Sequence, residues 1–139
     1  METPAICQQG IARLLASGER KILGLVAPPG AGKSTLAEAL IAHHAPQVQG
    51  VPMDGFHLAN RELVRLGRQQ RKGAPDTFDA AGFVNLLSRL KHQSPSETIY
   101  APEFRRDIEE PVAGAIAVVP ETKLVITEGN YLLLDDPFW

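Results

Sequence analysis

One stretch of the sequence has the residue types and spacing of a phosphate-binding loop, or P-loop. Residues 27–35 read Ala-Pro-Pro-Gly-Ala-Gly-Lys-Ser-Thr and match G-x-x-x-x-G-K-[ST], with Ala27 where the first glycine usually stands. In such a loop, backbone N–H groups surround the phosphates of a nucleotide, the lysine binds the β- and γ-phosphates, and a hydroxyl ligates Mg²⁺. We therefore predict a Mg²⁺–nucleotide site, with Ser34 on the metal, formed by Pro29, Gly30, Ala31, Gly32, Lys33, Ser34 and Thr35.

Two carboxylates follow apolar stretches elsewhere in the chain and extend this chemistry toward phosphoryl transfer. Asp54 comes directly after 48–53, and Glu128 comes directly after 123–127. Asp54 is the candidate base that takes a proton from a substrate hydroxyl, and Lys33 is the candidate catalytic cation. Glu128 is the candidate second residue near the metal. The alternatives are a turn-forming or helix-capping role for Asp54 and an ordinary loop carboxylate for Glu128.

Three further groups of residues are candidates for holding the second substrate. His57 lies in the same loop as Asp54, and the pairs Arg71-Lys72 and Arg105-Arg106 carry the charge that an anionic substrate or the transferred phosphate needs. Charged loops are most often only solvated, so neither pair is specific by itself.

The elements that must position these residues alternate between strands and helices. Apolar runs predict strands at 22–26, 48–53, 98–101, 115–119 and 123–127, and periodic patterns predict helices at 4–17, 36–44, 58–66 and 80–91, the last one capped by Asp79. The run at 22–26 is typical of the buried centre of a parallel sheet. The order predicts an α/β fold of three layers, with a mostly parallel sheet covered on both faces. The loop at Ala27, Asp54 and Glu128 would then meet at one edge of that sheet.

Length and composition are those of one globular domain that spans residues 1–139. The formal net charge of −2 gives no general case for nucleic-acid or membrane binding, and no apolar run approaches the roughly 18 to 20 residues of a membrane span. Cys7 is the only cysteine, and no secretory signal is recognised, which favours a cytoplasmic protein. The expected partner is a small molecule.

The motifs together resemble the P-loop kinases of the uridine kinase, phosphoribulokinase and bacterial pantothenate kinase group, most closely the bacterial nucleoside kinase-like or fructokinase-like proteins. The resemblance lies in the P-loop and in Met-Asp-Gly-Phe-His at 53–57, Arg-Lys-Gly-Ala-Pro-Asp-Thr-Phe-Asp at 71–79, the stretch 100–107, and Val-Ile-Thr-Glu-Gly-Asn-Tyr at 125–131. It implies a three-layer P-loop NTPase fold and ATP-dependent phosphorylation of a hydroxyl on a nucleoside, sugar or pantothenate-like acceptor. It also implies Asp54 as base and an acceptor site at Tyr100, Arg105 and Asp107, beside His57, Arg71 and Lys72.

The resemblance also implies a difference at the end of the chain. Proteins of this group continue into an Arg-bearing lid helix and an adenine-contacting segment, whereas this sequence ends at Trp139, so we expect a C-terminally truncated kinase domain. A lid supplies cations and excludes water, so nucleotide binding is expected to be retained better than turnover. An uncovered sheet edge would favour a homo-oligomer. The alternative function is a nucleotide-binding module or inactive kinase remnant without turnover.

Overall fold

A computed structural model of the chain describes residues 3–26 and 32–135, apart from the side chain of Lys33. A parallel sheet of three strands occupies the middle of this structure, in the order β1-β5-β2. The strands are β1 (Lys21–Val26), β2 (Val48–Gly50) and β5 (Leu124–Gly129), and every residue of β5 is buried. The predicted α/β fold with a parallel sheet is therefore confirmed, and the strand predicted at 123–127 forms its centre.

The position expected for the first strand is wrong. The run at 22–26 was predicted to lie at the buried centre of the sheet, but β1 is an edge strand of the described sheet and pairs with β5 alone. Its residues are half-buried or exposed. An apolar pocket of about 500 Å³ lies beside it, lined by residues that include Ile22, Val26, Val84 and Leu133. The self-association expected at an uncovered edge stays a prediction.

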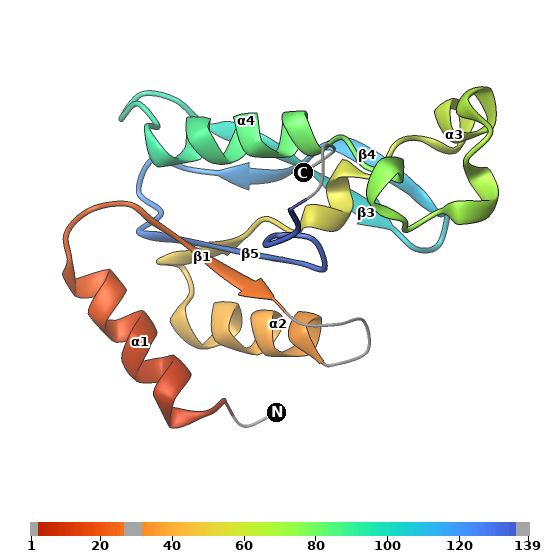
Figure 1. The fold of residues 1–139 in the computed structure, drawn as a ribbon. Helices are drawn as coiled ribbons and strands as arrows, with labels where there is room; N and C mark the ends of the chain where they lie inside the picture. Colours follow the sequence, from red (N-terminus) through yellow and green to blue (C-terminus); the bar gives the residue numbers. More distant parts are fainter. Residues whose placement is uncertain (1–2, 27–31, 136–139) are drawn as a thin grey trace.

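Helices cover the two faces of the sheet differently, as Figure 1 shows. Helices α1 (Ala5–Ala16) and α2 (Lys33–His44) lie on one face, while α4 (Ala80–Lys91) and a β-hairpin lie on the other. One core cluster joins α1 and α2 to the sheet through Ile11, Leu40, Val48, Leu124 and Ile126. A second joins α4 and the hairpin to the opposite face through Val51, Leu86, Leu90, Ile99, Val118 and Val125.

The hairpin extends the two short strands that the sequence predicted at 98–101 and 115–119. Strands β3 (Ile99–Arg105) and β4 (Glu110–Val118) pair antiparallel in a sheet of their own, so the charged stretch at 102–110 is largely strand. Burial alternates along β3 with Ile99 and Ala101 facing the core, and an irregularity in the pairing between Ala101 and Glu103 shifts the alternation by one residue, so that Glu103 and Arg105 face outward. This alternation allows a strand to carry many charges.

Short helical segments connect β2 to α4 and shape the site. The strand predicted at 48–53 ends at Gly50, and a 3₁₀ turn, η1 (Met53–Phe56), follows Pro52. Helix α3 (Asn60–Leu66) and the turns η2 (Gln69–Arg71) and η3 (Pro75–Thr77) come next. Helix α4 begins and ends where predicted, and the Asp79 side chain caps it by accepting a hydrogen bond from the Gly82 N–H at 2.9 Å. Asp-Asp-Pro at 135–137 also predicts the start of a helix, but the residues from 136 onward lie outside the described part of the chain.

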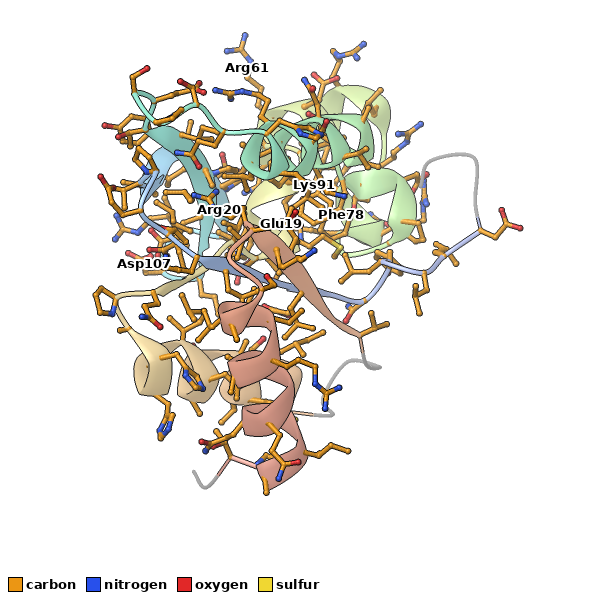
Figure 2. All side chains as sticks on the ribbon, turned by 90° about the vertical axis from the view of Figure 1, so that its left-hand side faces the viewer. Glu19, Arg20, Arg61, Phe78, Lys91 and Asp107 are labelled. Atoms are coloured by element: carbon orange, nitrogen blue, oxygen red, sulfur yellow. The ribbon has the colours of Figure 1, made fainter. Side chains whose placement is uncertain are left out.

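Arg20 fastens the end of the sheet that lies away from these turns. Figure 2 looks at the molecule from that side and labels Arg20 and Lys91. The Arg20 guanidinium donates hydrogen bonds to the carbonyl oxygens of Thr122, Leu90, Val119 and Pro120 and to Gln93 Oε1. Burial lowers the pKa of Arg20 from its ordinary value. This residue therefore ties the start of β1 to the end of α4 and to the loop before β5.

Candidate active site

Close packing of Gly129 against Met53 brings the two candidate carboxylates, Glu128 and Asp54, to one edge of the sheet. A Cβ added to Gly129 would lie 2.6 Å from Met53 Sδ and 2.8 Å from Met53 Cβ. Because real Cβ atoms do not approach so closely, only glycine lets the end of β5 touch the fully buried Met53. Glu128 precedes Gly129 and Asp54 follows Met53, so the carboxylates project from segments that are in contact.

Ser34 and Glu128 form a direct pair at this edge. Ser34 lies in the first turn of α2, and its Oγ donates a hydrogen bond to Glu128 Oε1 at 3.2 Å. The Glu128 residue is only 8% exposed. A hydroxyl and a carboxylate are hard oxygen ligands of the kind that Mg²⁺ prefers. The two residues predicted to lie near the metal are therefore brought together by the fold.

The donor set fits a cation that is shared with phosphate rather than enclosed by protein. Among the residues that the structure describes, no three His, Cys, Asp or Glu side chains converge as a metal site. Mg²⁺ in phosphoryl-transfer sites takes one or two protein ligands and completes its shell with phosphate oxygens and water. Ser34 and Glu128 match that requirement, and a bound Mg²⁺ would supply charge neutralisation for the phosphates.

The start of α2 has the backbone geometry that a phosphate-binding loop needs. Gly32 caps the helix with φ 83°, a left-handed conformation that favours glycine, and its carbonyl accepts the Leu36 N–H at 3.0 Å. The first N–H groups of the helix, at Lys33, Ser34 and Thr35, carry the positive end of the helix dipole. The predicted ligands Pro29, Gly30 and Ala31 lie outside the described residues, as does the side chain of Lys33.

Two more polar side chains flank Glu128, and the sequence did not single them out. Thr127 Oγ1 and Asn130 Oδ1 are buried and have no hydrogen-bond partner within the described part of the chain. Unpaired buried oxygens are costly in a folded protein, so they are typical of positions completed by water or a ligand. The only sequence signal for them was their place directly beside the carboxyl end of a buried strand.

Asp54 is held against the hairpin by the glycine that follows it. A Cβ on Gly55 would meet the Pro102 carbonyl oxygen at 2.2 Å and its carbon at 2.7 Å, so η1 packs directly on the backbone of β3. The Asp54 side chain is half-buried, and within residues 3–26 and 32–135 it makes no hydrogen bond or ion pair. The position of the carboxylate is thus set by its backbone, and the side chain is left partly exposed.

His57 is clamped three residues further along. Its ring lies between the rings of Phe78 and Phe104, with centroids 4.2 and 4.3 Å away. His57 Nδ1 lies 2.7 Å from the Asp54 carbonyl oxygen. Because a backbone carbonyl can only accept, Nδ1 carries the proton, and Nε2 of the neutral ring is a hydrogen-bond acceptor. The ring is therefore held in one position and one tautomer beside the candidate base.

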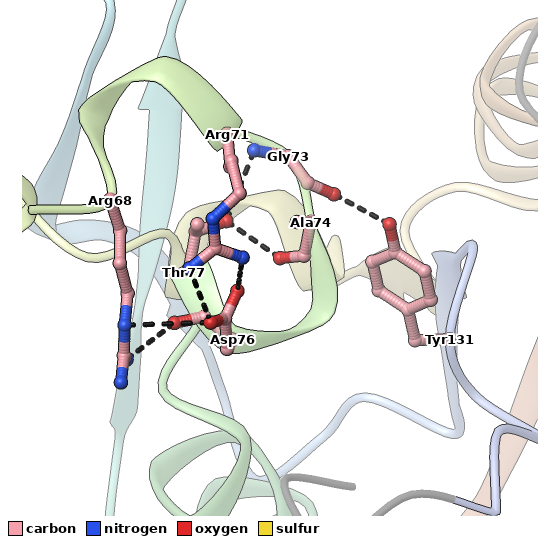
Figure 3. A network of polar contacts seen from close by, with 7 residues as sticks. All are labelled: Arg68, Arg71, Gly73, Ala74, Asp76, Thr77 and Tyr131. Carbon is pink, nitrogen blue, oxygen red and sulfur yellow. Dashed lines mark hydrogen bonds and ion pairs between the residues drawn. The ribbon is translucent and has the colours of Figure 1, made fainter.

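The predicted basic pair Arg71-Lys72 is engaged by neighbouring groups. Arg71 donates two hydrogen bonds to the Asp76 carboxylate, at 2.7 and 2.8 Å (Figure 3). This pairing with Arg71 lowers the pKa of Asp76. Lys72 Nζ donates to Asn60 Oδ1 and to the Glu109 carbonyl, both at 2.6 Å, and lies 5.2 Å from the centre of the Phe104 ring.

The predicted acceptor residues of the hairpin lie further toward the solvent. Tyr100 is 60% exposed on the outer face of β3. Arg105 and Asp107 form an exposed ion pair at 2.8 Å near the turn between β3 and β4. Within the described ranges no hydrogen bond or ion pair joins these three residues to Asp54 or Glu128, so their role stays a prediction.

The structure has the features of a P-loop fold: a parallel sheet, a helix that follows the phosphate loop, and the Ser34–Glu128 pair. Comparisons with known proteins identify the family of P-loop proteins to which it belongs. No protein-family model matches the sequence. A crystal structure of a putative fructose transport system kinase from Silicibacter sp. TM1040 is 44% identical, with a TM-score of 0.85, and the match covers 100% of this chain and 68% of that one.

Curated relatives point the same way. "Putative uridine kinase C227.14" of Schizosaccharomyces pombe is 39% identical over 135 residues, which are 91% of this chain and 57% of the relative. A pantothenate kinase of Mycolicibacterium vanbaalenii is 32% identical over 121 residues, which are 84% of this chain and 38% of the relative. The chain thus spans about half the length of the curated relatives it matches, or less. It belongs to the group of P-loop kinases that includes uridine kinase-like proteins and pantothenate kinases.

Proposed function

We propose that the protein phosphorylates a hydroxyl group of a small molecule with ATP. The observation that carries the proposal is the hydrogen bond between Ser34 and the buried Glu128, at the edge where Asp54 is also held. Kinase activity agrees with the names of the relatives, and the half-open position of Asp54 supports its role as base. No helix among the described residues is long and apolar enough to cross a membrane.

The nucleotide is held by the loop at 27–35 and the first turn of α2. Backbone N–H groups there bind phosphate oxygens, and the Lys33 ammonium neutralises the β- and γ-phosphates. Ser34 and Glu128 are the residues that would hold Mg²⁺, which supplies charge neutralisation when bound. Glu128 is kept ready for this role because its carboxylate is buried and already oriented by the Ser34 hydroxyl.

Transfer then needs one proton acceptor. The Asp54 carboxylate takes the proton of the acceptor hydroxyl while the hydroxyl oxygen bonds to the γ-phosphorus. The bond between that phosphorus and the oxygen bridging it to the β-phosphate breaks, and ADP leaves with the electron pair. His57 Nε2 is suited to accept a hydrogen bond from a second hydroxyl of the acceptor, because its ring is fixed by Phe78 and Phe104. This favours polyhydroxylated acceptors such as nucleosides and sugars, with pantothenate-like alcohols also included.

The second candidate function is nucleotide binding without turnover. It is favoured by the ion pairs of Arg71 with Asp76 and of Lys72 with Glu109, because these cations are then not directed at a transferring phosphate. An acceptor panel separates the two functions. The chain is incubated with Mg²⁺ and ATP plus nucleosides, sugars or pantothenate, and both ATP affinity and acceptor-dependent ADP formation are measured. ADP formation that depends on one acceptor supports the kinase, whereas tight ATP binding with no turnover on any acceptor supports the binding module.

A further inference from the structure

The segment between α3 and α4, residues 67–77, is a rigid unit that we call the acceptor loop. The Asp76 carboxylate accepts two hydrogen bonds from Arg71, and the Asp76 carbonyl accepts one from Arg68 at 2.9 Å. The fully buried Thr77 hydroxyl accepts the Gly73 N–H at 3.0 Å. These bonds join residues from both ends of the loop to one another, so a restraint on one part of the loop is expected to reach the rest.

One side chain from the nucleotide side of the molecule holds this loop. The Tyr131 hydroxyl donates a hydrogen bond to the Gly73 carbonyl oxygen, and Figure 3 shows it approaching from a separate segment. Gly73 has φ 98°, a conformation that favours glycine and sets the direction of this part of the backbone. Tyr131 is only three residues beyond Glu128, in the turn that ends β5. The contact therefore links the strand end that carries Glu128 to the loop that carries Arg71 and Lys72.

The Tyr131 ring makes a second contact in the same direction. It lies edge-on to Phe78, with centroids 5.7 Å apart, and Phe78 is one of the two rings that clamp His57. A shift of the turn after β5 would therefore displace the acceptor loop through the Tyr131 hydroxyl. It would also displace His57, because the Tyr131 ring contacts Phe78 and Phe78 contacts His57. Packed side chains with two contacts of this kind can transmit a small displacement.

We propose that Tyr131 is a positioning residue that couples the nucleotide site to the acceptor loop. Nucleotide and metal bound at Ser34 and Glu128 restrain the end of β5, and the Tyr131 hydroxyl passes this restraint to Gly73 and so to the whole loop. Linkage makes the coupling reciprocal, so an acceptor that holds the loop also tightens nucleotide binding. The proposal rests on the proposed function for its ligand, but the Tyr131–Gly73 restraint exists without one.

Amide hydrogen exchange of residues 67–77, followed by mass spectrometry, tests this coupling. Three proteins are compared: wild type, Tyr131→Phe, which keeps the ring but loses the hydroxyl, and Ser88→Ala, a control that removes an exposed hydroxyl on α4. Each is measured without ligand and with Mg²⁺ and an ATP analogue that has an imido β–γ bridge. Calorimetry records whether the analogue binds.

Without ligand, loss of one buried hydrogen bond should speed exchange of the loop about fivefold in Tyr131→Phe and leave the control unchanged. With the analogue bound, the loop should exchange more slowly in wild type and in the control, and this slowing should be absent in Tyr131→Phe. A merely structural hydroxyl would raise the ligand-free rate but leave the ligand-dependent slowing intact, which would overturn the coupling. Equal ligand-free rates in all three proteins would overturn the restraint itself. A chain that binds no analogue in calorimetry refutes the proposed function and the coupling, while the ligand-free rates still decide the restraint.

Discussion

Replacing Gly55 by alanine tests whether close packing on β3 holds the candidate base in place. The new Cβ would lie 2.2 Å from the Pro102 carbonyl oxygen, 2.7 Å from its carbon and 3.1 Å from Pro102 Cγ. An ordinary carbon–oxygen contact is about 3.3 Å or longer, so η1 and β3 must separate by about 1 Å. The neighbour cannot simply rotate away, because the nearest atoms belong to the backbone of a strand.

The size of the effect follows from this separation. Overpacking of a filled core costs about 1–3 kcal/mol, and a clash with backbone belongs at the upper end of that range. A loss of about 3 kcal/mol lowers the melting temperature of a domain of this size by roughly 10 °C. Because Asp54 is bonded to Gly55, the base would move by a similar distance, and a misplacement of about 1 Å can slow a reaction about 100-fold.

Urea unfolding and the rate of acceptor-dependent ADP formation measure the two effects separately. Gly10→Ala is the matched control, because a Cβ on Gly10 would have nothing within 4 Å and the residue lies inside helix α1. There the same substitution should stabilise the protein by about 0.5–1 kcal/mol, since alanine favours a helix more than glycine does. A Gly55→Ala protein that unfolds within about 0.5 kcal/mol of wild type and turns over normally would refute the packing argument.

Two further predictions concern single charged or titratable groups. Glu128→Gln should raise the Mg²⁺ concentration needed for half-maximal nucleotide binding about 10- to 100-fold, as measured by calorimetry. The control Glu121→Gln, in the exposed loop before β5, should leave this concentration unchanged. If both variants show the same Mg²⁺ dependence, Glu128 is not part of the metal site. His44 has a pKa below its ordinary value of 6.5, first because it is desolvated and second because of the nearby His43. The unfolded chain therefore binds this proton more readily, so the stability that neutral His44 provides is present above pH 6.5 and is lost as the pH falls below it. Urea midpoints at pH 8.0 and about 5.5 should differ more in wild type than in His44→Gln, and identical differences would contradict this assignment.

Local sequence signals were sufficient where one segment decides its own structure. The apolar face of α4 and its Asp79 cap predicted the helix to the residue, and the stretch 123–127, with its apolar centre at 124–126, predicted the buried strand β5. The P-loop motif predicted a helix after residue 35, but α2 begins earlier, at Lys33, so Ser34 and Thr35 lie in its first turn. The order of these elements was also enough to bring Ser34 and Glu128 to the same edge of the sheet.

Signals failed where structure depends on distant partners. The strand at 22–26 is as apolar as a central strand, but its place in the sheet depends on which strands pair with it, and in the described sheet it pairs with β5 alone. The charges at 102–110 concealed β3 because alternate side chains point to solvent. The contacts of Gly55 with Pro102 and of Tyr131 with Gly73 join residues far apart in the chain, so no local sequence pattern predicts them.

The most direct test of the central claim is the behaviour of Asp54→Asn in two measurements on the same protein. Asparagine has nearly the same shape but cannot take a proton, so Mg²⁺–ATP affinity measured by calorimetry should stay within about twofold of wild type. Phosphoryl transfer to the acceptor found in the panel should fall by about 100-fold or more, in keeping with loss of a general base. Transfer at the wild-type rate by Asp54→Asn would contradict the account, because the one carboxylate assigned to the chemistry would then be dispensable.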